Sequence, residues 1–201
     1  MNNPSVSRVF TMMGLFSKAR QSTAEARDVG GRFERVVVPH IPAAYNLARY
    51  LVRNEQDAED VAQEACLRAF RYLDSYRGID GRAWLLRIVR NTCYTFLSRK
   101  PETVVSFDDI GEVVAIGDGP ELSLLRKVDR ERLRDAVEAL PVPLREVIVL
   151  RELETLAYKE IAEIVDIPLG TVMSRLSRAR KQLAHCLMED GKGEGGGHGL
   201  S

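Results

Sequence analysis

The chain has 201 residues, of which 45% are apolar and 6% aromatic, a composition that suits one or two small globular domains. Its 29 basic residues balance its 29 acidic ones. No apolar run approaches the roughly 20 residues that a membrane-spanning helix needs, so we expect no membrane insertion. Cys66, Cys93 and Cys186 form no CxxC pair, which argues against a disulfide framework or a zinc finger and favours the cytoplasm. We expect no cofactor and no enzymatic activity, because no catalytic or metal-binding constellation is visible.

The zero net charge hides a strong pattern along the chain. Residues 102–125 carry six acids and no base, and Asn54–Glu64 holds five acids and no base. Arg77–Lys100 holds six bases against one acid, and Ile167–Met188 holds four bases and no acid. Because local charge sets the electrostatic footprint of a surface, the sequence predicts two basic faces and one acidic face.

The pattern between the two ends is helical almost throughout, so the predicted fold class is all-α. Residues 1–30 are expected to be a disordered extension rather than a signal peptide, because the apolar stretch Val9–Phe16 is short and basic residues follow it directly. Val113–Ile116 could be a strand fragment, but it has no alternating partner, and a linker is the better interpretation. We predict two small helical domains, over residues 31–101 and 126–190. A flexible acidic linker over residues 102–125 joins them, and a flexible Gly-rich tail over residues 191–201 follows the second.

The first domain contains a predicted helix over Asp57–Leu73. Leu67 and Phe70 fall outside its apolar stripe, among polar residues. They form either a partner surface or a patch that a third helix of the same domain covers. The expected core face consists of Ala58, Val61, Ala62, Ala65, Ala69 and Tyr72.

A second helix is predicted over Gly81–Ser98, with a basic face beside its apolar one. The loop Asp74–Asp80 that precedes it adds an aromatic and a basic side chain. Basic residues interleaved with aromatic side chains suit the binding of single-stranded nucleic acid. The basic residues pair with the phosphates, while the nucleobases stack on the aromatic rings or enter a pocket. Partial burial of Tyr76 and Tyr94 in the core is the alternative. The apolar face is Trp84, Leu85, Ile88, Val89 and Phe96, and the basic face is Arg87, Arg90, Asn91 and Tyr94.

The second domain is predicted to end in a helix-turn-helix. Ala157–Val165 forms a short amphipathic helix, Asp166 tolerates the left-handed turn, and Pro168 suits the first turn of the next helix. Ala157 occupies the expected N-cap of the first helix, where it leaves Glu160 without a reciprocal partner, and Thr155, one turn earlier, is the alternative cap. The second helix has an apolar stripe at Val172, Leu176, Ala179, Leu183 and Leu187. Its opposite face carries Ser174, Ser177, Arg178, Lys181 and His185, with Arg175 and Arg180 at the flanks.

A purely basic face on the second helix is typical of a helix that enters the DNA major groove. The alternative is an amphipathic hairpin whose outward charges are only solvated. A further helix, Leu140–Leu153, begins with two prolines and would pack across the pair.

Three strings, NEQDAEDVAQEACLRAFRYL, GRAWLLRIVRN and LREVIVLRELETLAYKEIAEIVDIPLGTVMSRLSRARKQL, resemble the extracytoplasmic-function (ECF) group of bacterial sigma-70-type sigma factors. The resemblance covers roughly residues 33–188. It implies sigma region 2 near 31–101 and region 4 near 126–190. It also implies a factor that directs core RNA polymerase to −10/−35 promoters and assists promoter melting, with a stress-responsive regulon under anti-sigma control.

The resemblance also implies a role for each surface. The core-binding set, which would dock on the β′ clamp helices, is Asp57, Asp60, Gln63, Glu64, Leu67 and Phe70. The −10 set, which would read the melted single strand, is Ser75, Tyr76, Arg77, Trp84, Arg87, Arg90, Asn91 and Tyr94. The −35 set, which would read duplex DNA, is Thr171, Met173, Ser174, Arg175, Ser177, Arg178 and Lys181. Met173 stands where the family often has a basic residue, and Ser177 where it often has a bulky one.

The implied partners are core RNA polymerase, through the β′ clamp helices and the β flap, promoter DNA, and an anti-sigma factor. Two rival functions remain: an ordinary helix-turn-helix regulator, and a sigma mimic that binds an anti-sigma factor without initiating transcription. The regulator would need a sensor or dimerisation domain where residues 33–101 hold a second nucleic-acid surface. The sigma mimic would not need a helix whose outward face is purely basic, because it does not bind promoters.

Overall fold

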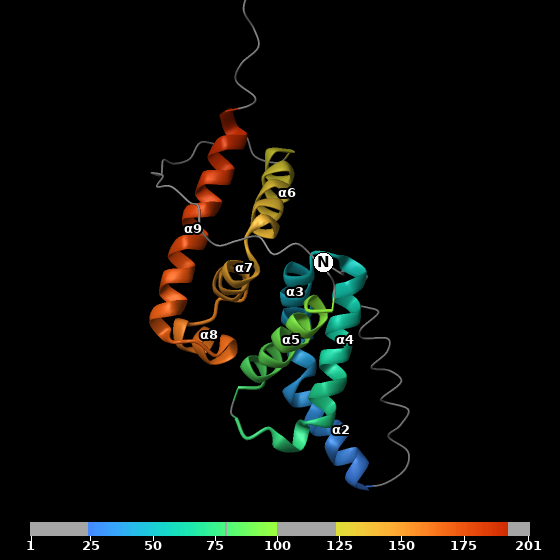
Figure 1. The fold of residues 1–201 in the computed structure, drawn as a ribbon. Helices are drawn as coiled ribbons and strands as arrows, with labels where there is room; N and C mark the ends of the chain where they lie inside the picture. Colours follow the sequence, from blue (N-terminus) through green and yellow to red (C-terminus); the bar gives the residue numbers. More distant parts are fainter. Residues whose placement is uncertain (1–23, 79, 100–123, 193–201) are drawn as a thin grey trace, which may run out of the picture.

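The computed structural model describes residues 24–78, 80–99 and 124–192, and these residues contain helices and turns but no β-strand. The all-α fold class is thereby confirmed. Most of residues 102–125, the tail from 193 onward and the Val9–Phe16 stretch lie outside the described residues. Figure 1 shows the helices in two groups, α2 to α5 and α6 to α9.

The N-terminal half is built around three helices that pack against one another, α3 (Ile41–Val52), α4 (Glu55–Arg71) and α5 (Gly81–Leu97). Side chains that accept backbone N–H groups begin two of them. Asn54 accepts from the Asp57 N–H at 3.0 Å, and Asp80 accepts from the Arg82 N–H at 2.8 Å. Two short 3₁₀ turns, η2 (Val38–His40) and η3 (Leu73–Ser75), complete this half with α2 (Ala24–Val36).

Two expectations for this half were wrong. Helix α2 begins at Ala24, inside the expected disordered extension, because its Val29 and Phe33 pack on the core of the N-terminal half. Tyr72, expected in the core, is 60% exposed. Helix α4 ends at Arg71, so the helical register that would have turned Tyr72 inward does not continue.

The C-terminal half comprises α6 (Leu124–Ala139), α7 (Val142–Ile148) with a π-helical turn η4 (Val149–Leu153), α8 (Tyr158–Val165) and α9 (Leu169–Lys192). Asp166 joins α8 to α9 with φ 58°, the left-handed turn that the sequence predicts. Val172, Leu176 and Ala179 of α9 are buried, but Leu187 is 40% exposed, so the apolar stripe of α9 becomes exposed toward its C-terminus.

The N-cap of α8 is Ala157, the residue that the sequence indicates, and not the alternative Thr155. Thr155 adopts φ 54°, a left-handed conformation unusual for a β-branched residue, and it does not cap the helix. Ala157 is the N-cap residue, and the Glu160 carboxylate accepts its backbone N–H at 2.5 Å. Half of a capping box therefore forms without a side-chain acceptor at the cap.

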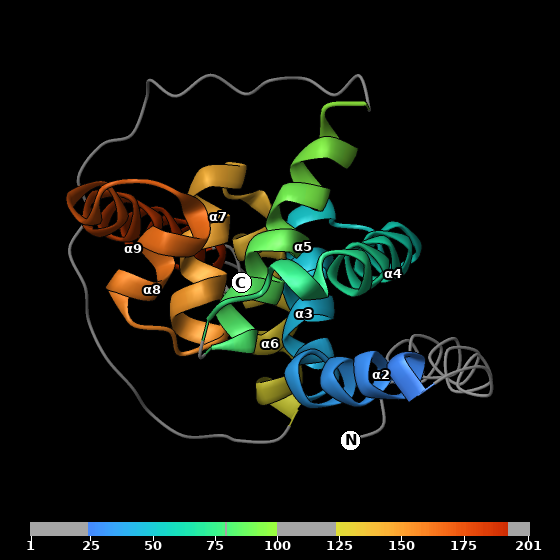
Figure 2. The same cartoon turned by 90° about the horizontal axis from the view of Figure 1, so that it is seen from below.

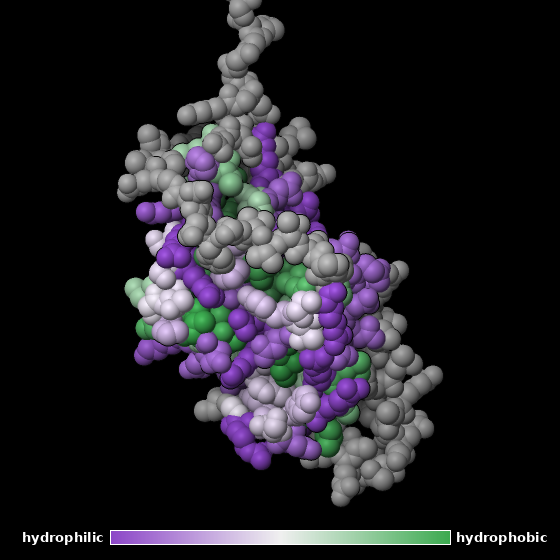
Figure 3. All heavy atoms as spheres, viewed as in Figure 1, coloured by the Kyte–Doolittle hydropathy of each residue, from purple (hydrophilic) through white to green (hydrophobic). Residues whose placement is uncertain are grey.

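The two halves pack against each other, which the sequence pattern did not predict. Helix α5 lies against α8, and α3 lies against α7, so most of the buried apolar residues form one continuous cluster across both halves. Figure 2, seen from below, shows α7 to α9 beside α3 to α5. On the face drawn in Figure 3, hydrophilic residues cover much of the surface and the apolar patches are separate from one another.

Candidate nucleic-acid interface

Helix α9 presents the basic face that the sequence predicts. Its buried stripe turns the opposite face outward, where Met173 is 53% exposed and Ser174, Ser177, Arg178 and Lys181 are also exposed. Thr171 is half-buried, and its carbonyl accepts the Ser174 hydroxyl at 3.0 Å. These side chains lie on the second helix of the helix-turn-helix, where the geometry suits entry into a major groove.

Arg175 differs from the rest of the −35 set. Its Nη1 lies 3.2 Å from Oε1 of Glu146, a carboxylate of α7 that is fully buried. On the other flank of α9, Arg180 pairs with the half-exposed Glu152 at 2.7 Å. Both flanking arginines are therefore tied to carboxylates of their own half, whereas the outward face is exposed.

The loop before α5 is held by contacts within it and by contacts with α2 and α5. The rings of Tyr76 and Trp84 lie 5.1 Å apart, and the Tyr76 carbonyl accepts from Arg32 at 3.1 Å. Arg77 donates to the Asp74 carbonyl at 2.8 Å, and the Ser75 hydroxyl donates to the Tyr72 carbonyl. Four members of the −10 set are thus brought together around one turn.

Helix α5 carries the other four members in two different environments. Arg87 and Asn91 are exposed. Arg90 places its guanidinium 4.5 Å from the ring centre of Tyr94 and its Nε 3.0 Å from Oε2 of Glu146. Burial, reinforced by the charge of Glu146, raises the pKa of Tyr94, so the phenol stays protonated.

Glu146 is the point at which α5, α7 and α9 meet. Burial raises the pKa of its carboxyl group, while the guanidinium groups of Arg90 and Arg175 and a hydrogen bond with Tyr94 oppose that rise. Sequence reasoning missed this residue. The available signal was an acid inside the apolar run LREVIVL, where an ion is normally too costly to bury without partners.

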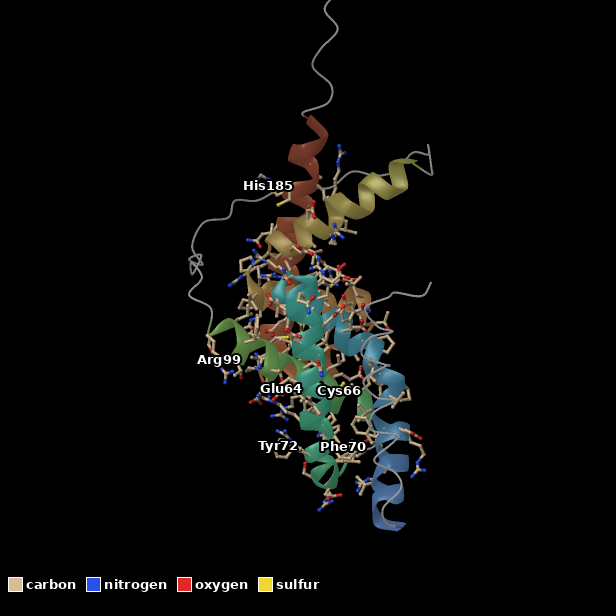
Figure 4. All side chains as sticks on the ribbon, turned by 90° about the vertical axis from the view of Figure 1, so that its right-hand side faces the viewer. Glu64, Cys66, Phe70, Tyr72, Arg99 and His185 are labelled. Carbon is tan, nitrogen blue, oxygen red and sulfur yellow. The ribbon has the colours of Figure 1, made fainter. Side chains whose placement is uncertain are left out.

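The candidate polymerase-binding residues of the acidic helix α4 differ in their exposure to solvent. Asp60 is exposed, Asp57, Gln63 and Leu67 are half-buried, and Glu64 pairs with Arg68 at 2.7 Å. Phe70 packs edge-on against Phe33 of α2 with ring centres 5.4 Å apart, so a neighbouring helix partly covers it. Figure 4 shows Phe70 and Tyr72 near one end of α4 and Glu64 farther along it.

Two features are absent from the part of the chain that the structure describes, a metal-ligand cluster and a membrane-spanning helix. No group of three or more His, Cys, Asp or Glu side chains is arranged there to hold a metal ion. None of the described helices is long and apolar enough to cross a membrane.

Two protein-family models match the chain, Sigma-70 region 2 over residues 36–102 and Sigma-70 region 4 over residues 130–183. The chain is 40% identical over 147 residues to an ECF RNA polymerase sigma-E factor of Haemophilus influenzae, covering 68% of this chain and 77% of that relative. It is 33% identical over 165 residues to the RNA polymerase sigma-H factor of Pseudomonas aeruginosa, covering 77% of this chain and 86% of that protein.

Two solved structures share the fold of this chain. The sigma factor RpoE of Bartonella quintana, solved with the anti-sigma factor NepR, superimposes with a TM-score of 0.60 at 28% identity, over 79% of this chain and 98% of that one. CnrH, solved with the cytosolic domain of CnrY, shares the fold with a TM-score of 0.58 at 24% identity, over 88% and 96%.

Two packed helical halves, the second of which ends in a helix-turn-helix with a basic outward face, are the architecture of a helical nucleic-acid-binding protein. The chain belongs to the ECF group of the sigma-70 family, as the resemblance implied. Proteins of this family are transcription initiation factors.

Proposed function

We propose that this sigma factor directs core RNA polymerase to promoters through region 2, within residues 31–101, and region 4, within residues 126–190, and has no catalytic activity of its own. The observation that carries the proposal is the exposed basic face of α9 on the second helix of the helix-turn-helix. In a sigma-family chain, that face is suited to reading the −35 element as duplex DNA.

Within the −35 set, the outward side chains are the proposed readers. Arg178 and Lys181 are placed to contact phosphates or guanine edges, and Ser174 and Ser177 offer hydroxyl groups. Arg175 has a different role in this proposal. Its pairing with Glu146 supports the packing of α9 on α7, so it positions the reading helix.

The −10 element is the proposed ligand of the Tyr76–Trp84 turn and of the α5 face with Arg87 and Asn91. The aromatic rings of Tyr76 and Trp84 can stack on unpaired nucleobases, while the guanidinium group of Arg87 neutralises phosphates. Polymerase docking is assigned to α4, where Asp60 is exposed and Asp57, Gln63, Glu64 and Leu67 are partly accessible. Phe70 contributes to this surface through its packing on α2.

Control by an anti-sigma protein in the cytoplasm is part of the proposal. It is supported by the similarity to RpoE, which was solved with its anti-sigma factor. Such a partner would compete with core polymerase for α4, so inhibition should be competitive.

Run-off transcription from genomic promoter fragments, with core polymerase alone and with this protein added, tests the function. We expect start sites that appear only when the protein is added. Tight and sequence-specific DNA binding by the isolated protein, without stimulation of polymerase, would support the ordinary-regulator alternative. Binding of an anti-sigma protein without any stimulation of transcription by core polymerase would support the sigma-mimic alternative.

A further inference from the structure

Helix α9 exposes two large apolar side chains in its first two turns. Leu169 is 40% exposed and Met173 is 53% exposed. They stand four residues apart, so they lie on successive turns of the same face of the helix. We call these two residues the apolar strip of α9. Because exposure of such side chains to water is unfavourable, the strip favours a ligand that carries an apolar group.

The strip lies at the end of α9 that adjoins α8 (Figure 1). Val172 and Leu176 are buried, which fixes the rotation of the helix and turns Met173 and Ser174 toward solvent. In a helix-turn-helix, the N-terminal residues of the second helix are the ones that contact base edges. The strip is therefore continuous with the proposed −35 surface and is placed against base edges rather than phosphates.

The same part of α9 offers the groove no unpaired positive charge. Within residues 169–177, all of which the structure describes, Arg175 is the only charged residue. Its guanidinium pairs with the buried carboxylate of Glu146 at 3.2 Å. Arg178 and Lys181 lie farther along the helix. A bidentate arginine on guanine, the commonest specific contact in the major groove, is thus not available at the start of α9.

The remaining groups at the start of α9 match an A·T base pair. Thymine presents a C5-methyl group to the major groove, and apolar side chains contact it there. The flexible, polarisable thioether of Met173 adapts well to so small an apolar group. Beside it, the Ser174 hydroxyl donates to the Thr171 carbonyl at 3.0 Å, so its oxygen can accept from the amino group of adenine.

We infer that the apolar strip reads the C5-methyl group of a thymine in the −35 element, with Met173 in contact with the methyl group and Leu169 extending the apolar surface by one turn. The inference rests on the proposed function for the identification of α9 as the −35 reader. Met173 stands where the family often has a basic residue, so the thymine requirement distinguishes this chain from relatives that carry a charge there.

Deoxyuridine tests the inference, because it differs from thymidine only in lacking the C5-methyl group. The −35 element is first located upstream of the start sites mapped by run-off transcription with core polymerase. Each thymine of either strand is then replaced by deoxyuridine, one at a time. With the wild-type protein, one replacement should lower transcription about fourfold, since burial of one such carbon contributes about 0.8 kcal/mol and about 1.4 kcal/mol is tenfold.

The variant M173A completes a double-mutant cycle with the missing methyl group. In M173A, the thymine and deoxyuridine templates should be transcribed equally at that position. L187A is the matched control, because Leu187 is also 40% exposed on α9 but lies toward the other end of the helix. It should keep the fourfold preference for thymine.

A third template separates the methyl group from the rest of the base pair. Replacing the T·A pair by C·G should lower transcription by the wild-type protein, and 5-methylcytosine in place of that cytosine should restore part of the loss. M173A should not distinguish cytosine from 5-methylcytosine. Circular dichroism and thermal unfolding check that M173A is folded, as expected for a substitution at an exposed position.

Equal transcription of all thymine and deoxyuridine templates by the wild-type protein would overturn the inference and leave the proposed function intact. A fourfold preference that persists in M173A would also overturn it, because another residue would then read the methyl group. If no start sites appear with core polymerase, the proposed function fails. Duplexes selected by the full chain from a random pool then carry the same comparison by fluorescence anisotropy, where loss of the preference in M173A supports the inference and its persistence contradicts it.

Discussion

At the scale of single residues, the arginines of α9 divide by their contacts. Arg178 is exposed on the outward face, whereas Arg175 donates to a carboxylate that has no exposed surface. Both occur in one short basic segment of the sequence, SRLSRARK, and look equivalent there. Their substitution should therefore have different consequences.

Replacing Arg178 by alanine should lower promoter-dependent run-off transcription by about tenfold or more, because a base-reading or phosphate-binding arginine contributes about 1–3 kcal/mol. The thermal stability of the protein should not change. Replacing Arg175 by alanine should instead lower the free energy of unfolding by about 1–3 kcal/mol, since Glu146 loses a charged partner while buried. Equal loss of transcription in both variants with unchanged melting temperatures would contradict this division.

The cysteines offer a second residue-level test. Burial raises the pKa of Cys66 to about 11 and that of Cys93 to about 12, so at pH 8 both thiols are almost entirely protonated as well as inaccessible. Cys186 is partly exposed. Iodoacetamide at pH 8 should label Cys186 first, and mass spectrometry should find Cys66 and Cys93 labelled at a comparable rate only in denaturant. Fast labelling of Cys93 in the native protein would contradict the burial of α5.

At the scale of elements, one close approach positions the start of α5. A Cβ atom added at Gly81 would lie 2.3 Å from the Val36 carbonyl oxygen, a distance that real Cβ contacts do not show. Because the obstruction is backbone, a side-chain rotation cannot relieve it. Glycine is thus required where α5 meets the end of α2.

G81A should lower the free energy of unfolding by about 1–3 kcal/mol, the usual cost of forcing extra volume into a packed site. G170A is the matched control, because a Cβ there meets nothing within 4 Å and alanine favours a helix by about 0.5–1 kcal/mol over glycine. Chemical denaturation of both variants measures the two effects. An unchanged midpoint for G81A would mean that α2 and α5 do not approach as described.

At the scale of the whole molecule, each basic surface is small and the two halves are in contact. The free protein should bind duplex promoter DNA weakly, with an affinity that falls steeply as salt rises, because phosphate contacts release counterions. Adding core polymerase should convert this into promoter-specific binding, measured by fluorescence anisotropy over a salt series. Specific binding of the free protein at physiological salt would contradict the expectation.

Local patterns were sufficient for helices α4, α5, α8 and α9 and for the resemblance to the family, but they gave no bounds for α3 or α6. The stripe at Val172, Leu176 and Ala179 predicted which face of α9 is buried, and the left-handed turn at Asp166 followed from residue type and position. These features depend on periodicity and backbone sterics, which act over a few residues. Tyr72 shows the limit of such reasoning, because the predicted stripe ran one residue beyond the end of α4.

The tertiary structure alone decided what the charged residues do. Nothing near Glu146 in the sequence predicts that Arg90 and Arg175, on two other helices, share its carboxylate, or that Arg82 reaches Glu154 across 72 positions. Residue type and spacing indicate that an arginine is available to DNA. Whether it is free or bound to a carboxylate depends on which helices meet, and that follows from the packing of the two halves.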